Sequence, residues 1–409
     1  MSERPAVLKG WPDARGIDAA VAAGADVLGG AFRYPLALLK DAAIDRNVAA
    51  MAAYCTAQDV LLAPHAKTTM APALCRRQLD AGAWGLTVAT WAQAQTMWEA
   101  GFHRLVLANP LVGAGEIAWA ATSAGDGEIV SFADDVDAVR RLDAGVAAAA
   151  PGACLPVLVE VGYAGGRCGV RSVAAAVELA SEIAALPHLE LAGVAGFEGL
   201  LAAGAEPSEL ARVAGYLAAI AEAAEAIAAR GLFGARPPLL SAGGSSFFDL
   251  AVDALAPTAR ALGGRVLLRS GCYVTHDHGI YARTGPSGGR APIAPFEPAL
   301  EVWGLVLSRP EPGRAIAGVG KRDVAFDMGL PQPVAWRRGD GPVQAAPDVT
   351  TDALNDQHAH LVLAADADLR PGDLIGFGIS HPCAAFDRWR SLALVDERYR
   401  LRGEIATSF

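Results

Sequence analysis

Residues 61–72, LLAPHAKTTMAP, place reactive side chains directly after an apolar run. The run is typical of the end of a buried strand, and Pro64 disfavours helical geometry in the residue before it. From Met70 onward, apolar residues recur at three- and four-residue spacing, which indicates a helix. Because α/β sheets and barrels hold their chemistry at the carboxyl ends of strands, we take His65 and Lys67 as candidate catalytic residues.

Other polar groups follow later strands of the predicted barrel. Arg167 and Glu198 follow two of them, and the last two strands end in SAGGSS (241–246) and RSGCY (269–273). In such barrels, the loops after the last two strands commonly bind phosphate. Glycines there let backbone N–H groups approach an anion closely, although GGSS also occurs in ordinary turns. The candidate cofactor-binding residues from these segments are Ser241, Gly243, Gly244, Ser245, Gly271, Cys272 and Tyr273.

A lysine that faces a phosphate site across a barrel mouth suggests pyridoxal phosphate. The lysine amine forms a Schiff base with the cofactor aldehyde, and a desolvated position lowers its pKa enough to make it nucleophilic. A solvated loop lysine is the alternative interpretation of Lys67. The apolar approach LLAPHA argues against that alternative.

A candidate metal site comes from SHPCAAF, where His381 and Cys383 lie two residues apart. On extended chain, this spacing points both side chains to one face. Imidazole and thiolate together are typical zinc ligands, although such a pair also arises by chance. A second pair, His276 and His278, is better explained by a polar loop near the barrel exit.

These residues must be positioned by a repeating arrangement of strands and helices. Eight short β-rich segments, each followed by a helix-like segment, predict parallel strands with helical crossovers. The predicted fold is an α/β (β/α)8 barrel over residues 35–290, with a doubly wound open sheet as the alternative. The eight strands are expected within 60–67, 85–90, 104–112, 128–135, 155–162, 189–199, 237–245 and 265–273.

The character of the sequence changes near residue 291. Alternating apolar residues and Pro-Gly or Gly-Asp turns replace the helical pattern and predict an antiparallel β domain over residues 291–409. We expect residues 1–34 to join this domain.

Composition narrows the possible partners and compartment. The chain has 409 residues, 53% of them hydrophobic, and a formal net charge of −10, with no basic run that would indicate a nucleic-acid partner. We expect no signal peptide and no membrane span. The six cysteines form no disulfide pattern, which favours a reducing cytoplasm.

Several motifs resemble, in order along the chain, those of the fold-type III pyridoxal phosphate enzymes. The most similar branch contains D-serine dehydratase, D-threonine aldolase and related D-amino acid deaminases. APHAKTTM resembles its lysine motif, and VEVGYAGGRCGV its strand-five motif with a cofactor-side arginine, here Arg167. SAGGSS and RSGCYV resemble its phosphate-binding segments, GVGKRDVAFDMGLP a motif of its β domain, and DQHAHL and HPCAAF the segments near its metal.

The resemblance implies that Lys67 binds pyridoxal phosphate and acts as the general base. It also implies that His381 and Cys383 bind zinc or another divalent metal. The dehydratase branch has a cysteine where the aldolase branch has an aspartate, so Cys383 favours β-elimination. We therefore expect a β-hydroxy D-amino acid such as D-serine to give a 2-oxo acid and ammonia.

Two alternatives to this reaction stay open. One is metal-dependent retro-aldol cleavage to glycine and an aldehyde, and the other is a non-catalytic pyridoxal phosphate-binding protein. The family resemblance also implies a homodimer, in which the β domain of one subunit lies against the barrel of the other.

Overall fold

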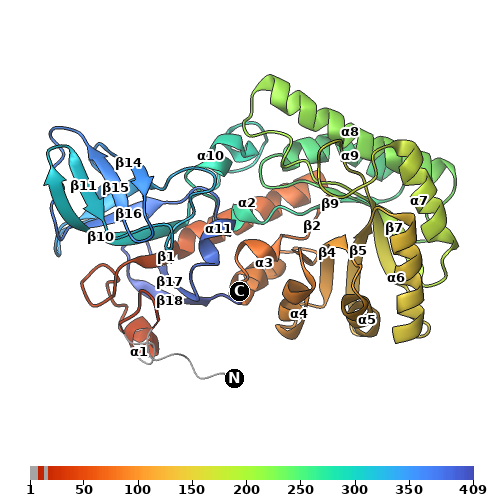
Figure 1. Ribbon diagram of the computed structural model, residues 1–409, viewed down its shortest axis with the longest axis horizontal. Coiled ribbons are helices and arrows are strands. Elements are labelled where there is room, and N and C mark those ends of the chain that lie inside the picture. The colour runs from red at the N-terminus through yellow and green to blue at the C-terminus, as the bar shows by residue number, and fades with distance from the viewer. Residues whose placement is uncertain (1–7, 13–16) are drawn as a thin grey trace.

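The computed structural model describes residues 8–12 and 17–409, and Figure 1 shows two units side by side. One is a parallel sheet surrounded by helices, and the other is a mostly antiparallel β domain. The predicted fold class is confirmed. The predictions for residues 1–7 and 13–16 lie outside the described residues.

All eight predicted strands are present in the first unit. Their order in the sheet, β2-β9-β8-β7-β6-β5-β4-β3, is that of a barrel unrolled between its first two strands. The bounds are β2 (Leu61–Leu62), β3 (Leu86–Val88), β4 (Arg104–Pro110), β5 (Glu128–Ala133), β6 (Leu155–Glu160), β7 (Leu189–Ala195), β8 (Leu239–Ala242) and β9 (Arg265–Leu268).

Backbone hydrogen bonds beyond the end of β2 close the barrel. The N–H of Trp84 donates to Leu62 O over 2.7 Å, the N–H of Thr87 donates to Pro64 O over 2.9 Å, and His65 forms an isolated parallel bridge with Thr87. The first strand is short because proline at position 64 has no N–H to donate. The segment with His65 and Lys67 is nevertheless fixed to the barrel wall.

Helices cover the outside of the barrel. Seven follow strands as expected, whereas α2 precedes β2 and packs beside α9, where Tyr54 meets Phe248 with ring centroids 5.2 Å apart. The helix bounds are α2 (Asp41–Gln58), α3 (Pro72–Asp80), α4 (Trp91–Glu99), α5 (Ala114–Ser123), α6 (Val136–Ala149), α7 (Val173–Ala185), α8 (Pro207–Ala229) and α9 (Phe248–Ala261). No helix among the described residues is long and apolar enough to cross a membrane.

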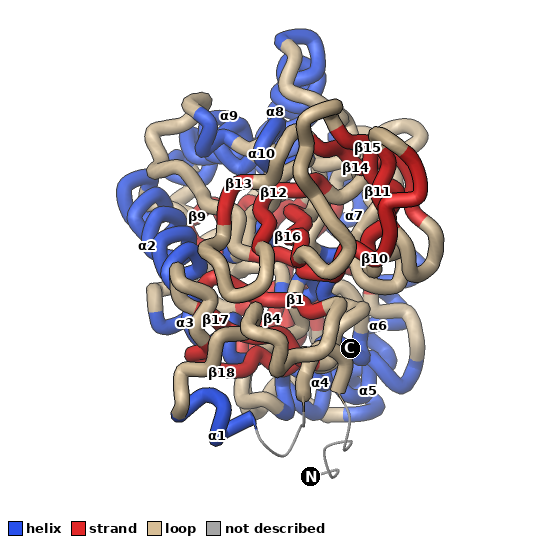
Figure 2. The backbone as a smooth tube through the Cα atoms, turned by 90° about the vertical axis from the view of Figure 1, so that its left-hand side faces the viewer, coloured by secondary structure: helices blue, strands red, loops and turns tan. Residues whose placement is uncertain are grey.

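The second unit is a ten-stranded sheet (Figure 2). Eight of its nine neighbour pairs on and off the main path are antiparallel, as predicted, but β1 pairs parallel with β17. Its strands are β1 (Leu36–Lys40), β10 (Leu300–Glu311), β11 (Arg314–Ala317), β12 (Gln332–Arg337), β13 (Gln344–Ala345), β14 (Val349–Leu354), β15 (Ala359–Leu363), β16 (Leu374–Gly378), β17 (Ser391–Val395) and β18 (Leu401–Ala406).

Strand β1 connects the two units, although it lies within the range 35–290 predicted for the barrel. It pairs with β10 and β17 in the second sheet, and α2 starts at the next residue. The described residues before it also belong to the second unit, because Trp11 and Leu28 are buried in one cluster with Trp303. The short helix α1 (Ile17–Ala22) packs against β18.

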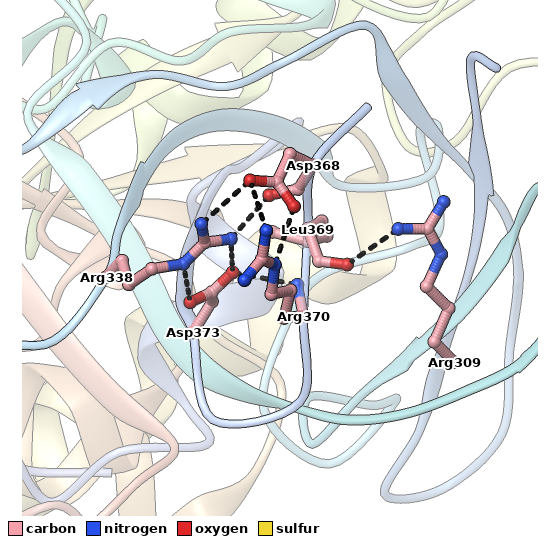
Figure 3. Close-up of polar contacts among 6 residues, drawn as sticks. All are labelled: Arg309, Arg338, Asp368, Leu369, Arg370 and Asp373. Carbon is pink, nitrogen blue, oxygen red and sulfur yellow. Dashed lines mark hydrogen bonds and ion pairs between the residues drawn. The ribbon is translucent and has the colours of Figure 1, made fainter. Parts of the chain in front are cut away.

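An ion-pair network fixes the loop before β16 (Figure 3). The guanidinium of Arg338 donates to both carboxylate oxygens of Asp373 over 2.9 and 2.8 Å, and to Asp368 over 2.8 Å. Arg370 also donates to Asp368, and the two arginines lower the pKa of that carboxyl to about 2. The two carboxylates differ in burial: the side chain of Asp368 is 54% exposed and that of Asp373 only 4%.

We expect Arg338 to couple more strongly to Asp373 than to Asp368. Solvent weakens an exposed ion pair, whereas a buried carboxylate that loses its partner keeps its desolvation cost. Double-mutant cycles that combine Arg338→Gln with Asp373→Asn or Asp368→Asn, read by urea unfolding, measure both coupling energies. Equal coupling energies would contradict this expectation.

Candidate active site

Three short segments converge at the carboxyl end of the barrel. The 3-10 turn η2 (Ala66–Thr68) follows β2, and η3 (Cys272–Val274) follows β9, the neighbour of β2 in the sheet. The helix α11 (Cys383–Phe386) comes from the second unit and packs against η2 at the junction of the two units (Figure 1). Residues distant in sequence are thereby brought together.

Lys67 lies in η2 and is half-buried. Its side chain forms no hydrogen bond or ion pair with any residue that the structure describes. Its positive charge acts to lower the pKa of both His65 and Cys383. A half-buried amine without an acceptor is free to react with a carbonyl group. Lys67 therefore lies at the carboxyl end of the barrel, in the turn that α11 of the second unit contacts.

His65 lies beside Lys67 with its side chain largely buried. Its Nδ1 atom has no hydrogen-bond partner among the described residues. Burial holds the pKa of the imidazole well below its ordinary value, and the charges of Lys67 and Arg269 lower it further. His65 is therefore neutral near pH 7, with a nitrogen that can accept a hydrogen bond.

Two predicted phosphate donors are already engaged by a carboxylate. The N–H groups of Gly243 and Gly244 donate to the buried Glu198 over 3.2 and 2.5 Å. Gly243 has φ +91°, a conformation that favours glycine. These N–H groups do bind an anionic group, but in this structure the anion belongs to the protein.

Other donors remain for a phosphate group. The half-buried N–H of Ser245 and the buried N–H of Gly271 have no partner among the described residues. The N–H of Cys272 donates to Ser245 Oγ over 3.1 Å, which holds the two loops together. Unpaired buried N–H groups are rare, so these residues fit the phosphate of pyridoxal phosphate.

A buried polar network lies beneath this cluster. The guanidinium of Arg269 donates to Ser241 Oγ over 2.5 Å and to Gly196 O over 2.6 Å. Burial lowers the pKa of Arg269, and the negative charges of Glu198 and Glu160 oppose that shift. Burial raises the pKa of Glu160, while Arg269 opposes that shift. Ser241 therefore stabilises the barrel wall, and its hydroxyl is engaged by this network.

Two other predicted cofactor residues pack their side chains against aromatic rings: Arg167, whose charge still lowers the pKa of His65, and Tyr273, which lies within η3. Arg167 is exposed, with its guanidinium 4.6 Å from the centroid of the Phe197 ring. Tyr273 is buried against Phe296, with ring centroids 5.8 Å apart, and lines a pocket beside α2 with Cys55.

The two units meet through two thiols and a hydroxyl. Cys272 Sγ and Cys383 Sγ are 3.2 Å apart, and Thr68 Oγ1 lies 3.7 Å from the first sulfur and 3.3 Å from the second. A hydrogen bond from Cys383 lowers the pKa of Cys272, and the same contact raises that of Cys383. Tyr281 in α10 (Ile280–Thr284) also bonds to Cys272.

His381 is held on both its backbone and its ring. Its backbone has φ +69°, and its N–H donates to the buried Asp277 Oδ2 over 2.9 Å. Its Nδ1 lies 2.6 Å from Asp327 Oδ2. Asp277 also accepts, through Oδ1, the N–H groups of Gly279, Tyr281 and Ala282.

This arrangement suits a metal ligand. Metal-binding histidines usually pair one ring nitrogen with a carboxylate, which orients the other nitrogen toward the metal. No group of three or more His, Cys, Asp or Glu side chains converges on a common point in the described part of the chain.

Sequence reasoning missed four residues that organise this site: Thr68, Asp277, Tyr281 and Asp327. Each lies within or next to a segment that was considered, namely KTT, THDHGIY and FDMG. Residue type alone gave no signal for them, because their roles depend on partners distant in sequence.

Comparison with known proteins agrees with this geometry. The family described as "Alanine racemase, N-terminal domain" matches residues 40–256, more than half of the chain. The chain belongs to this family. It is thus a fold-type III pyridoxal phosphate enzyme, as the motifs indicated. The family described as "Putative serine dehydratase domain" matches residues 299–395 in the second unit.

Individual proteins are similar to this one over most of the chain. A D-threonine aldolase from Arthrobacter sp is 29% identical over 79% of this chain and 78% of its own length. The crystal structure of D-threonine aldolase from Filomicrobium marinum has a TM-score of 0.77 and 26% identity, covering 92% of this chain and 95% of that one. D-threo-3-hydroxyaspartate dehydratase from Delftia sp. HT23, at 22% identity, shares the fold with a TM-score of 0.74, over 92% of this chain and 97% of that one.

We expect the free energy of unfolding to decrease as the pH falls below about 6.5. Burial lowers the pKa of His65, His276 and His278 in the folded protein. The unfolded chain therefore binds protons that the folded chain does not, at a cost of up to about 1.4 kcal/mol per pH unit for each histidine. Urea unfolding from about pH 8 to about pH 5.5 measures this slope. His278→Asn should reduce the slope of unfolding free energy against pH, whereas His103→Asn, at the surface, should leave it unchanged. Equal slopes in both variants would contradict the expectation.

We expect Gly271→Ala to weaken pyridoxal phosphate binding about tenfold or more, the effect of moving one supporting contact. A Cβ atom at Gly271 would lie 2.5 Å from His65 O and 2.8 Å from Thr68 Oγ1, so η3 and its free N–H must shift. Equilibrium titration of the apo-protein measures the dissociation constant. Gly215→Ala, in helix α8 with open space around it, is the matched control and should leave the constant unchanged. An unchanged constant in both variants would remove Gly271 from the phosphate site.

Proposed function

We propose that this protein is a pyridoxal phosphate-dependent lyase that acts on β-hydroxy D-amino acids. The observation that carries the proposal is the position of Lys67, an amine with no acceptor among the described residues, in a turn that contacts both Gly271 and α11. Similarity to a D-threonine aldolase over most of the chain supports the same reaction class.

Bound pyridoxal phosphate would supply an electron sink that stabilises negative charge at the substrate Cα. Lys67 would hold the cofactor and, once the substrate amine replaces it, take the Cα proton as general base. His65 is neutral and offers a free Nδ1 next to Lys67. It can orient the lysine or accept a hydrogen bond from substrate without bringing a second positive charge.

We propose β-elimination as the specific reaction, with D-serine as a representative substrate and a 2-oxo acid and ammonia as products. Hydroxide is a poor leaving group near neutral pH, and a Lewis acid on the β-hydroxyl removes this difficulty. His381, through the ring nitrogen that does not face Asp327, and Cys383, through its sulfur, would hold zinc there. One solved structure of a D-threo-3-hydroxyaspartate dehydratase is described as a mutant in the metal-free form.

Retro-aldol cleavage to glycine and an aldehyde is the second candidate. The named relatives from Arthrobacter and Filomicrobium, both D-threonine aldolases, favour it. The same metal position would then promote loss of the hydroxyl proton instead of the hydroxyl group. The products distinguish the two reactions directly.

We also propose that the protein acts as a homodimer in a reducing compartment such as the cytoplasm. The spacing of the six cysteines in the sequence, which forms no disulfide pattern, supports the reducing compartment. Phe326, Met328 and Leu330 are 37–40% exposed in the loop that carries Asp327, next to His381. A second subunit that covers this loop would bury these apolar side chains.

We expect Lys67→Ala to abolish the visible absorbance band of lysine-bound pyridoxal phosphate and to reduce turnover by about a thousandfold or more, the scale of losing a catalytic base and its covalent link. Absorbance spectra and steady-state kinetics measure both effects. Lys9→Ala, in the N-terminal segment, is the matched control. A borohydride-reducible adduct that persists in Lys67→Ala would show that another lysine binds the cofactor.

We expect a chelator to stop oxo-acid formation from D-serine without removing the visible band, because the metal and cofactor sites use different residues. Zinc add-back should restore turnover to the wild type but not to Cys383→Ala. A panel of D-serine, D-threonine and their L-enantiomers, with oxo acid and aldehyde measured in parallel, identifies the reaction. Full turnover in chelated enzyme would exclude the metal role, and release of glycine with an aldehyde would establish the aldolase instead.

A further inference from the structure

The sulfur atoms of Cys272 and Cys383 are close enough to react with each other. They lie 3.2 Å apart although 111 positions separate the two residues in the sequence. One belongs to the end of the barrel and the other to the second unit. No other cysteine pair in the described part of the chain makes such a contact, and Cys55 and Cys75 are buried in the core around the barrel.

We propose that Cys272 and Cys383 are a site of reversible oxidative modification, where a peroxide converts the two thiols to a disulfide. The disulfide itself depends only on this geometry. Its consequence for activity rests on the proposed function, because it would remove Cys383 from the metal.

The local geometry requires little movement for this bond. A disulfide needs its sulfur atoms about 2.05 Å apart, so the two atoms must approach by about 1 Å. Cys272 is the first residue of η3 and Cys383 the first residue of α11. Both turns are short, and Thr68 Oγ1 already contacts both sulfur atoms. A rotation of the side chains can therefore close the distance without separating the two units.

The reaction balances with hydrogen peroxide as the oxidant. Peroxide reaches the pair from the side of Cys383, which is partly exposed while Cys272 is 4% exposed. One of the two sulfur atoms, as its thiolate, attacks one peroxide oxygen, and the O–O bond breaks to give a sulfenic acid and, with one proton, water. The second sulfur then attacks the sulfenic sulfur, the S–O bond breaks, and a second water leaves with the thiol proton. Two electrons pass from the sulfur atoms to the peroxide, and a dithiol reductant returns them by exchange.

Two consequences follow for the molecule. A sulfur atom in a disulfide carries no thiolate charge, so it is lost as a ligand of the zinc type. The bond also links the barrel covalently to the second unit across 111 positions, and a crosslink over a long loop restricts the unfolded chain. The oxidised protein should therefore unfold at a higher temperature while turning over substrate more slowly.

The experiment treats the purified holoenzyme, with and without prior chelation, with graded hydrogen peroxide. Non-reducing digestion and mass spectrometry should reveal a crosslink between the peptides that carry Cys272 and Cys383, with loss of the mass of two hydrogen atoms. Oxo-acid or aldehyde formation should fall about tenfold or more, as expected for a lost metal contact, and dithiothreitol should restore it. The midpoint temperature of thermal unfolding should rise when the crosslink forms and return to its starting value on reduction.

The controls separate this proposal from the proposed function. Cys272→Ser must lose the crosslink and the upward thermal shift, whereas Cys154→Ser, at an exposed position away from the site, must keep both and keep basal activity. Added zinc should slow the crosslink if Cys383 binds metal; a crosslink that forms equally fast with zinc supports the modification and contradicts only the metal role. Absence of the Cys272–Cys383 peptide in oxidised wild-type protein overturns the proposal, whatever the enzyme's activity.

Discussion

The approach of η3 to the backbone of η2 is the constraint on which the rest of the site depends. Position 271 admits only glycine, because a Cβ atom there would lie 2.5 Å from the carbonyl oxygen of His65. This contact places the loop after the last strand directly against the segment that carries Lys67. It also leaves the N–H of Gly271 buried and free, so an amine and an anion site lie next to each other.

The second unit completes the site from outside the barrel. Strand β1 pairs in the second sheet and leads without a loop into α2, which packs on the barrel next to α9. That connection keeps the sheet beside the barrel mouth and brings α11 onto η2. Asp277 then holds His381 from the barrel side. The predicted metal ligands and the predicted lysine therefore belong to one site although they come from different units.

Several charged side chains are buried beneath this site. Arg269 lies under the cluster with Glu160 and Glu198, and removal of one partner would leave an uncompensated buried charge. Glu198 uses the N–H groups that sequence reasoning had assigned to phosphate. The same low-dielectric surroundings keep His65 neutral beside Lys67, which suits an amine that must lose and regain protons.

The sequence by itself determined the eight barrel strands, the β domain after residue 291 and the segments that form the site, because each depends on local apolar periodicity or on a short motif. The pairing of β1 with the second sheet was not predictable, since four apolar residues followed by a lysine fit either unit equally well. Three features are visible only in the tertiary structure. The side chain of Tyr273 points into the core, and the N–H groups of Gly243 and Gly244 donate to Glu198. Cys272 lies against Cys383. These features depend on contacts between residues distant in sequence, and local pattern carries no information about which side chain will lie opposite another.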